Sequence, residues 1–168
     1  MDQALHVLND LEKEGTLTRY AIGGAIGALF YTEPFTTFDL DVFVIIPQPT
    51  ETIIYSLQPL YARLQELGYP AEKECVNIGG IPVQFLPTYN PLLEEALNAA
   101  IDTQYNTIPT RVLSVEHLVA ISVQTGRPKD RARIPMFQEA NVLNESKLMD
   151  ILTRYHLMEK WLLWTSSK

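Results

Sequence analysis

The chain has 168 residues, of which 46% are hydrophobic, and its 20 acidic and 13 basic side chains give a net charge of −7. This length suffices for one well-buried domain and is too short for two. The acidic balance argues against a nucleic-acid coat protein, and the single cysteine, Cys75, excludes an internal disulfide. The apolar runs are far shorter than the roughly twenty residues of a membrane span, and the N-terminus is unlike a signal peptide, so a cytoplasmic protein without membrane contact is expected.

The charge is unevenly distributed along the chain. Residues 1–126 carry 5 basic and 15 acidic side chains, whereas residues 127–168 carry 8 basic and 5 acidic ones. The two parts can form opposite walls of a cleft, with a metal on the acidic side and phosphate on the basic side. The alternative is charge scatter without a functional meaning.

The first elements predicted are a helix, a strand and a second helix. Met1 to Glu14 places apolar residues on one face at helical spacing, and Gly15 can end this helix in a left-handed conformation. Arg19 to Ile22 reads as a short strand that runs into Gly23-Gly24. Ala25 to Tyr31 then returns to small and apolar helix formers. The sequence therefore predicts a strand, a glycine turn and a helix.

The next segment predicts a buried strand and a further helical stretch. Asp39 to Ile46 is rich in β-branched and aromatic residues, which favours a strand buried on at least one face. Thr50 can cap a helical stretch that ends at Gly68. Pro59 must either kink this stretch or start a second helix.

A hairpin is predicted next in the chain. Glu72 to Ile78 and Ile81 to Leu86 are two strands joined by Gly79-Gly80 as a two-residue turn, so part of the sheet is antiparallel. Pro91 to Ala100 is expected to be a helix with proline in its first turn, and residues 102–113 are irregular or extended.

The last third of the chain reads as helical. Ser114 can cap a helix from Val115 to Gln124, and Gly126 can end it. Three more segments have helical character: Ile134 to Gln138, Lys147 to Arg154 and Leu157 to Leu163. The fold class expected is α+β (α/β), a small mixed sheet with C-terminal helices. Residues 1–168 form one domain in this interpretation, with a mixed core over 1–113 and a helical portion over 114–168.

Two aspartates are the first candidates for chemistry. In a strand, alternate side chains point the same way, so Asp39 and Asp41 share one face about 7 Å apart. Like charges repel, and a divalent cation that prefers oxygen ligands, such as Mg²⁺, is the usual partner of such a pair. The alternative is that Asp39 is solvated at the strand entrance and Asp41 is an edge-strand charge.

The glycine pair adds a second candidate feature. Gly23-Gly24 leads into a helix N-terminus, where backbone amides favour phosphate and absent side chains allow close approach. The alternative is a simple tight turn. A dinucleotide fingerprint fits less well, because its first glycine falls at Ile22. Glycines for phosphate and aspartates for metal together indicate a Mg-nucleotide site.

Together, Gly23-Gly24, the helix that follows and Asp39-Leu40-Asp41 resemble the signature of the DNA polymerase beta-type nucleotidyltransferase superfamily. They resemble in particular its minimal and abortive-infection toxin-like (AbiEii-type) members. The segment "SVEHLVAISVQTGRPKDRARI", from Ser114 to Ile134, is similar to a helix and "GRxKD" segment of the toxin-like members. The two matches cover about a third of the chain.

The resemblance implies transfer of a nucleoside monophosphate from a nucleoside triphosphate to a hydroxyl of an RNA or protein acceptor. Asp39 and Asp41 would be the catalytic and Mg²⁺-binding residues, and Gly23 and Gly24 would hold the outer phosphates. A toxin-like role would bring an antitoxin-like partner.

Two cations complete the site that the resemblance implies. Arg127 and Lys129 lie in a polar turn after a helix and are the cations best placed to approach phosphate. Asp130 can orient one of them. The alternative interpretation of this turn is a solvated basic loop.

The chain also departs from the pattern of this superfamily. A third carboxylate usually sits on the later hairpin strand, where this chain has Gln84, which cannot accept a proton. The enzyme would then be slow, would use metal and water instead, or would recruit another acid such as Glu74 or Glu33. Toxin-like members tend to have a lysine at the position of Ser122 and an acid at that of Arg133.

Two functions therefore stay open from sequence, an enzyme and a catalytically impaired module that binds a nucleotide or a partner. A third interpretation, an αβ scaffold without nucleotide, requires Asp39 and Asp41 to lie far from the glycines. The three histidines are scattered, and no Ser-His-Asp arrangement can be inferred from their positions.

Overall fold

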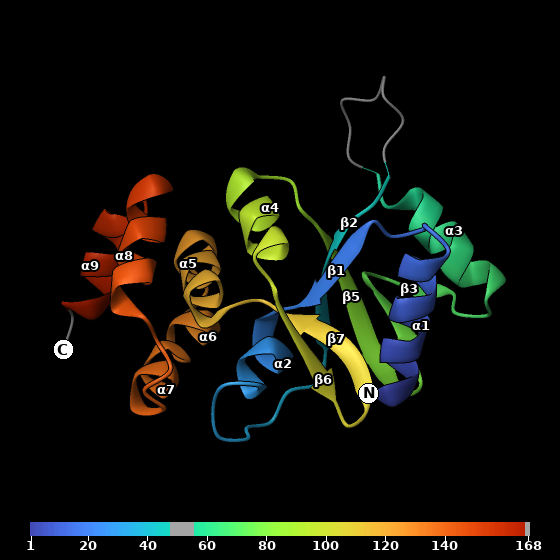
Figure 1. The fold of residues 1–168 in the computed structure, drawn as a ribbon, viewed down its shortest axis with the longest axis horizontal. Helices are drawn as coiled ribbons and strands as arrows, with labels where there is room; N and C mark the ends of the chain where they lie inside the picture. The colour runs from blue at the N-terminus through green and yellow to red at the C-terminus, as the bar shows by residue number, and fades with distance from the viewer. Residues whose placement is uncertain (48–55, 167–168) are drawn as a thin grey trace.

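The structure is a computed structural model that describes residues 1–47 and 56–166, and its centre is a seven-stranded mixed sheet with helices on both faces (Figure 1). The strands are β1 Arg19–Ile22, β2 Leu40–Ile45, β3 Ala71–Glu72, β4 Cys75–Ile78, β5 Ile81–Pro87, β6 Ile101–Tyr105 and β7 Ile108–Val112. The helices are α1 Asp2–Lys13, α2 Gly24–Leu29, α3 Gln58–Glu66, α4 Pro91–Asn98, α5 Val115–Thr125, α6 Pro128–Arg131, α7 Ile134–Glu139, α8 Glu145–Arg154 and α9 Met158–Thr165. The predicted α+β class, a mixed sheet followed by C-terminal helices, is confirmed.

The sheet has the strand order β3-β4-β5-β2-β1-β7-β6. Strand β2 pairs with β1 antiparallel and with β5 parallel, and β1 pairs with β7 parallel. The β4–β5 and β6–β7 pairs are antiparallel hairpins at the two sides. Strand β2, which carries the end of the predicted Asp-Leu-Asp segment, therefore lies in the middle of the sheet.

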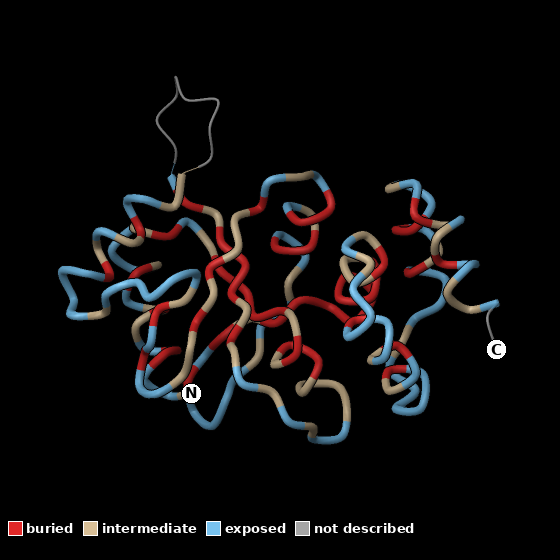
Figure 2. Tube along the Cα trace, turned by 180° about the vertical axis from the view of Figure 1, so that it is seen from behind, coloured by how far each residue is buried: buried red, intermediate tan, exposed pale blue. Residues whose placement is uncertain are grey.

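The two faces of the sheet are covered by different helices. Leu40, Val42 and Val44 of β2 are buried in one apolar cluster together with residues of α1 and α3. Phe43 points to the other face, into a second cluster to which α4, α5 and α8 contribute. Figure 2 shows buried residues along the strands and on the sheet-facing sides of the helices. Alternation along β2 thus places Asp41 on the face of α2 and α5.

Several local signals act as the sequence predicts. Gly15 follows α1 with a φ of +84°, and Gly126 ends α5 in the left-handed conformation with a φ of +77°. Both angles favour glycine because it lacks Cβ. The Ser114 side chain accepts a hydrogen bond from the His117 backbone amide at the start of α5. The C-terminal helices α7, α8 and α9 are also confirmed within small shifts of their ends.

Other segments differ from the prediction or settle an alternative that it left open. The expected strand from Glu72 to Ile78 is broken into β3 and β4 by a turn in which Lys73 has a φ of 60°. Residues 102–113, expected to be irregular or extended, form most of a hairpin whose turn contains Asn106 at positive φ. Pro59 lies in the first turn of α3 and so starts a helix. Thr50 lies outside the described residues.

Within residues 1–47 and 56–166, no helix is both long and apolar enough to span a bilayer. The C-terminal series of helices begins after β7, at the start of α5. In Figure 1, helices α5 to α9 lie beyond α2 and α4 on one side of the sheet. This arrangement brings the C-terminal helices next to the face that carries Asp41.

Candidate functional site

The glycine pair packs directly against β2. The Gly23 amide donates a hydrogen bond to the Asp41 carbonyl over 2.9 Å. A Cβ on Gly23 would come within 2.3 Å of the Phe43 ring, and one on Gly24 within 1.7 Å of Asp41 Oδ2. Gly24 also has a φ of +54°. Both positions therefore exclude larger side chains, because the backbone before α2 touches the strand and the carboxylate beside it.

The structure places Asp39 and Asp41 close to each other, although only Asp41 lies within a strand. Asp39 is the last residue before β2, and both side chains are partly exposed. Burial raises the pKa of Asp41, and the negative charge of Asp39 raises it further. The positive charges of Arg127, Lys129 and Arg133 act in the opposite direction. Two like charges therefore meet at the start of β2, with basic groups within electrostatic range.

Gln84 lies beside Asp41 on the neighbouring strand. The parallel register of β2 and β5 pairs Asp41 with Gln84, so the two side chains share one face. This is the position for which the resemblance implies a third carboxylate. Among the acids considered as replacements, Glu33 is an exposed residue of the loop between α2 and β2. Glu74 is in the turn before β4.

Cys75 is a residue near the site that the sequence did not indicate. Burial raises the pKa of its thiol, and the negative charges of Asp39, Glu74 and Asp41 add to this effect. Pairing of Val76 with Val83 makes Cys75 the β4 neighbour of Gln84. The position of Cys75 beside Gln84 could have been predicted from the hairpin, because a two-residue turn between two strands fixes which of their residues face each other.

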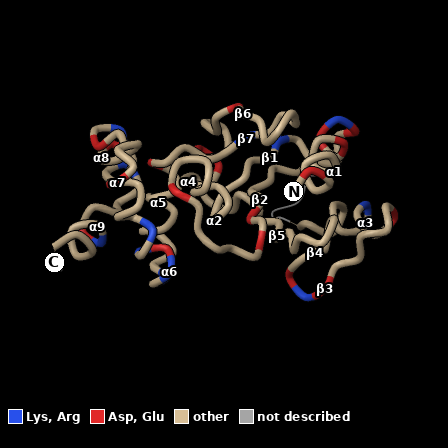
Figure 3. Tube along the Cα trace, turned by 90° about the horizontal axis from the view of Figure 1, so that it is seen from below, with Lys and Arg blue, Asp and Glu red and all other residues tan. Residues whose placement is uncertain are grey.

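The basic wall of the site comes from the segment after α5. Asp130 is only 2% exposed, and its carboxylate accepts hydrogen bonds from Arg127 Nε at 2.6 Å and Arg133 Nη1 at 3.0 Å. Lys129 is exposed on α6. In Figure 3, α6 with its Lys and Arg lies apart from the Asp and Glu positions at the start of β2, with α2 between them.

A small cavity of about 40 Å³ joins the two walls. Its lining includes Gly24, Asp41, Ser122, Arg127, Asp130 and Arg133. The Ser122 hydroxyl donates a hydrogen bond to the Leu118 carbonyl one turn earlier, over 2.7 Å. The Ser122 hydroxyl is thus satisfied within its own helix. At this position, where toxin-like members tend to have a lysine, the cavity has no positive charge. The other lining residues are apolar: Ala28, Phe43, Leu86, Leu118, Ile121 and Phe137. A small, half-apolar space therefore has Asp41 and Gly24 on one side and the segment that holds Arg127, Asp130 and Arg133 on the other.

The carboxylates of the site fit a metal that arrives with its substrate. Over residues 1–47 and 56–166, no group of three or more His, Cys, Asp and Glu side chains is arranged to hold a metal ion. The pair of Asp39 and Asp41 offers carboxylate oxygens, which Mg²⁺ prefers, and its mutual repulsion is what a hard cation relieves. Mg²⁺ usually keeps several waters and uses one or two carboxylates together with substrate phosphates. Two carboxylates therefore fit a magnesium ion that is bound together with a nucleotide.

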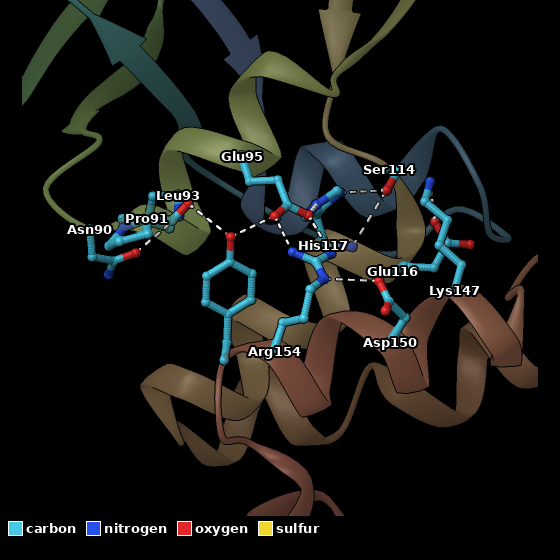
Figure 4. A network of polar contacts seen from close by, with 11 residues as sticks. Asn90, Pro91, Leu93, Glu95, Ser114, Glu116, His117, Lys147, Asp150 and Arg154 are labelled. Carbon is cyan, nitrogen blue, oxygen red and sulfur yellow. Dashed lines mark hydrogen bonds and ion pairs between the residues drawn. The ribbon is translucent and has the colours of Figure 1, made fainter.

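A second polar network lies away from this cavity, between α4, α5 and α8 (Figure 4). His117 Nε2 lies 3.2 Å from Glu95 Oε1, and Ser114 Oγ lies 2.9 Å from His117 Nδ1. Arg154 Nη2 and the Tyr155 hydroxyl also donate to the Glu95 carboxylate. Arg154 holds the pKa of Glu95 at about 2, with help from Tyr155 and His117.

Ser114, His117 and Glu95 are linked in the same order as the serine, histidine and carboxylate of a hydrolase triad. Unlike the serine of such a triad, Ser114 is not accessible to a substrate. Ser114 and His117 are each 1% exposed, and burial lowers the pKa of the imidazole. A substrate cannot reach a serine in this position. Since Glu95 is ionised, His117 donates from Nε2 and accepts from the Ser114 hydroxyl at Nδ1. The network joins the C-terminal helices to the sheet-bearing part of the chain.

A mixed sheet in which a glycine turn and helix pack on the carboxylate of an adjoining strand, followed by C-terminal helices, is similar to solved nucleotidyltransferase-like structures. The chain aligns with the solution structure of the antibiotic-resistance factor ANT(2'')-Ia over 96% of its own length and 94% of that chain, with a TM-score of 0.56 and 18% identity. The crystal structure of ANT(2'')-Ia with adenylyl-2''-tobramycin gives a TM-score of 0.57 and 16% identity, over 94% of this chain and 98% of that one.

A third solved structure is similar to the same extent. An antigenic nucleotidyltransferase-like protein from Paracoccidioides brasiliensis aligns over 95% of this chain and 88% of its own, with a TM-score of 0.57 and 13% identity. By sequence, the chain matches no family model and no curated protein. The chain thus has a nucleotidyltransferase-like fold, as predicted, and the toxin-like subgroup stays a prediction.

Proposed function

We propose that the protein is a Mg²⁺-dependent nucleotidyltransferase that moves a nucleoside monophosphate from a nucleoside triphosphate to a hydroxyl of an RNA or protein acceptor. The observation that carries this proposal is the cavity in which the Asp41 carboxylate, packed on Gly24, faces Arg127 and Arg133. Acidic and basic residues around one space suit part of a metal-bound triphosphate, whose negative oxygens need partners on both sides.

The residues of the chain have separate tasks in the proposed reaction. Asp39 and Asp41 would hold Mg²⁺, which when bound neutralises phosphate charge and orients the triphosphate. Gly24 lets the backbone lie against the Asp41 carboxylate, because a side chain at this position would collide with it. The Gly23 amide is engaged with the Asp41 carbonyl, so Gly23 contributes close packing. Arg127 and Lys129 bring positive charge to the phosphates.

The chemistry is an in-line displacement at the α-phosphorus. The acceptor hydroxyl oxygen forms a bond to this phosphorus, the bond to the oxygen that bridges the α- and β-phosphates breaks, and pyrophosphate leaves with that electron pair. The hydroxyl proton passes to solvent water, because Gln84 beside Asp41 cannot accept it. Positioning and charge stabilisation therefore supply most of the expected rate enhancement.

The first experiment is a calorimetric titration of ATP, GTP, CTP and UTP with and without Mg²⁺. We expect Mg²⁺-dependent binding in the natural chain and its loss in Asp39→Asn/Asp41→Asn. Asp10→Asn/Glu159→Gln removes two exposed acids remote from the cavity and serves as the charge-matched control. A folded protein that binds none of the four nucleotides would refute the proposal. Transfer of labelled nucleotide to RNA or protein then tests the reaction itself.

A catalytically impaired module is the second candidate function, and Gln84 in register with Asp41 favours it. Such a module would bind a nucleotide or a protein partner, including an antitoxin-like one, without turnover. The calorimetric and transfer experiments separate the two functions, since the module binds nucleotide and transfers nothing.

A small amine-bearing acceptor is a further candidate substrate, because ANT(2'')-Ia was crystallised with adenylyl-2''-tobramycin. A groove of about 550 Å³ between the end of α2 and α7 supports it, since Glu33 and Glu139 line the groove together with Tyr31. Carboxylates and an aromatic ring suit amines. Labelled-nucleotide transfer to tobramycin, compared between the natural chain and Glu33→Gln/Glu139→Gln, tests this acceptor.

A further inference from the structure

The buried carboxylate of Asp130 organises two arginines on one wall of the cavity. Its Oδ2 accepts from Arg127 Nε at 2.6 Å and its Oδ1 accepts from Arg133 Nη1 at 3.0 Å, so each oxygen holds one guanidinium group. Thr125 Oγ1 lies 3.3 Å from Oδ2 and shares its proton with the closer Ile121 and Ser122 carbonyls. Asp130 is 2% exposed, and a carboxylate buried to this degree is costly unless it is paired in this way.

The pairing leaves positive charge in excess. Asp130 carries one negative charge, whereas Arg127 and Arg133 carry two positive charges and line the same cavity as Asp41 and Gly24. The guanidinium nitrogens that Asp130 does not occupy are donors in a fixed planar fork. This wall is therefore prearranged for an anion that offers several oxygens.

Arg133 is the more buried of the two arginines. Its side chain is 19% exposed against 54% for Arg127, and Lys129 is exposed on α6. Arg131, between them, turns away and donates to the Trp164 carbonyl over 2.8 Å. Three arginines of one short segment thus take different directions, and two of them point to the cavity.

We propose that Arg133 is a phosphate-binding residue of this site and that Asp130 is the positioning residue that fixes it together with Arg127. The pair would bind the terminal phosphates of the nucleoside triphosphate, which become the leaving pyrophosphate. Binding of nucleotide phosphates by this pair rests on the proposed function. Binding of an inorganic anion by the same pair requires no metal.

The chemistry of the leaving group explains why a fixed pair is useful. When the bond at the α-phosphorus breaks, negative charge grows on the pyrophosphate. Guanidinium groups bind phosphate oxygens through two parallel hydrogen bonds, and groups held in place beforehand need no rearrangement as the charge develops. An exposed lysine such as Lys129 loses more side-chain freedom for the same contact.

The test is binding of inorganic tripolyphosphate in EDTA, measured by calorimetry on the whole chain. We expect Arg133→Gln to weaken binding about 10-fold to 100-fold, the usual effect of losing a hydrogen bond between charged groups. Arg133→Lys keeps the charge and loses the fork, so an intermediate loss is expected. Arg131→Gln removes an arginine from the same segment that points elsewhere, and it should bind like the natural chain.

The positioning role needs a separate readout. Asp130→Asn leaves both arginines present but weakens their anchor, so tripolyphosphate binding should fall in protein that keeps its near-UV circular dichroism. If this variant does not fold, Asp130→Glu, which keeps the charge and shifts the carboxylate that Arg127 and Arg133 contact, provides a milder change of the same anchor, and tripolyphosphate binding should again fall. In transfer assays, Arg133→Gln should raise KM for the nucleotide and lower kcat.

Three outcomes would overturn the inference. The first is that the natural protein does not bind tripolyphosphate. The second is that Arg133→Gln binds tripolyphosphate as tightly as the natural chain, and the third is that Arg131→Gln loses as much affinity as Arg133→Gln. Asp39→Asn/Asp41→Asn should keep tripolyphosphate binding in EDTA while losing Mg²⁺-dependent nucleotide binding. Anion binding that depends on Arg133 without any nucleotide binding would refute the transferase and leave the anion site standing, so the two failures are distinguishable.

Discussion

The carboxylate of Asp41 lies against the backbone of Gly24, so close that a methyl group on the Gly24 Cα would fall 1.7 Å from Oδ2. Gly24 also has a φ of +54°, which residues with a side chain rarely adopt. One residue therefore meets two demands, a left-handed turn into α2 and a close contact of the backbone with the carboxylate on β2. The predicted glycine turn and the predicted aspartate are parts of one contact.

Gly24→Ala should destabilise the chain and displace Asp41. The positive φ alone costs about 1–2 kcal/mol for a residue with Cβ, and the contact with the carboxylate adds to this cost. Gly15→Ala is the matched control, because Gly15 has a φ of +84° and a methyl group on its Cα would meet no atom within 4 Å. Denaturant unfolding should show a larger loss for Gly24→Ala than for Gly15→Ala, and equal losses would contradict the contact argument.

The sequence predicted those parts of the fold that depend on local chemistry. The apolar spacing of α1, the Ser114 cap and Gly126 each act within one or two turns of the chain, so their effect is readable from neighbouring residues. The hairpin at Gly79-Gly80 is equally local. What the sequence did not predict is the order of the strands, with β7 inserted between β1 and β6, because the pairing of Ile22 with Val112 joins residues far apart in the chain.

The candidate site residues stay a prediction, and the structure brings only some of them together. Asp41, Gly24 and Arg127 were selected from short motifs and line one cavity, whose lining does not include Asp39, Gly23 or Lys129. Cys75 and Arg133 were not selected, since their nearness to Asp41 depends on how β4 and the segment after α5 pack. The contact between His117 and Glu95 likewise joins α5 to α4 across the fold. Spacing along the chain carries no information about such contacts.

Asp41→Asn should stabilise the metal-free chain at neutral pH. Burial and Asp39 raise the pKa of Asp41 in the folded state above its ordinary value of 3.8. Between the two values the folded chain holds more protons than the unfolded chain, so the free energy of unfolding falls as the pH rises through this window. The ionised carboxylate therefore lowers stability at pH 7, and asparagine removes that effect.

Thermal unfolding in EDTA at pH 7 and at pH 3 provides the measurement. The gain of Asp41→Asn over the natural chain should be present at pH 7 and vanish at pH 3, where the acid is protonated in both states. Added Mg²⁺ and nucleotide should raise the melting temperature of the natural chain and leave that of Asp41→Asn unchanged. Asp10→Asn, which removes an exposed acid on α1, is the control. A variant less stable than the natural chain at pH 7 would contradict the prediction.

Glu95→Gln should loosen the attachment of α8 to α4. Arg154, Tyr155 and His117 all contact this carboxylate, and hydrogen bonds from Arg154 first, then from Tyr155 and His117, hold its pKa at about 2. Because the pair is partly exposed and screened by solvent, the expected loss is about 1 kcal/mol. The lowered pKa means that the stabilisation is complete above pH 4.5, the ordinary value, and is lost as the pH falls toward 2.

Urea unfolding at pH 7 and pH 3 tests this loss. The difference between the natural chain and Glu95→Gln should shrink at the lower pH. Asp150→Asn is the control, because Asp150 also pairs with Arg154 but is 65% exposed, and its effect should stay within about 0.5 kcal/mol. A difference that does not depend on pH would assign the effect to packing and not to the charge of Glu95.

Gln84→Glu should raise the rate of the proposed nucleotide transfer. The register of β2 and β5 sets residue 84 beside Asp41, so glutamate would add a third carboxylate on the face that holds the proposed metal. That group can accept the proton of the acceptor hydroxyl, and general-base assistance is typically worth about 10²-fold to 10⁴-fold in rate. It also adds an oxygen ligand, so Mg²⁺ should bind more tightly.

Single-turnover transfer of labelled nucleotide measures the gain against the natural chain. Gln84→Met introduces a side chain similar in size to glutamate but without a carboxylate. It should show neither the faster transfer nor the tighter Mg²⁺ binding. An increase in rate would mean that the chain already positions its substrates and lacks only the base. Tighter Mg²⁺ binding without any transfer would favour the impaired module, because a complete set of carboxylates would then still lack an acceptor site.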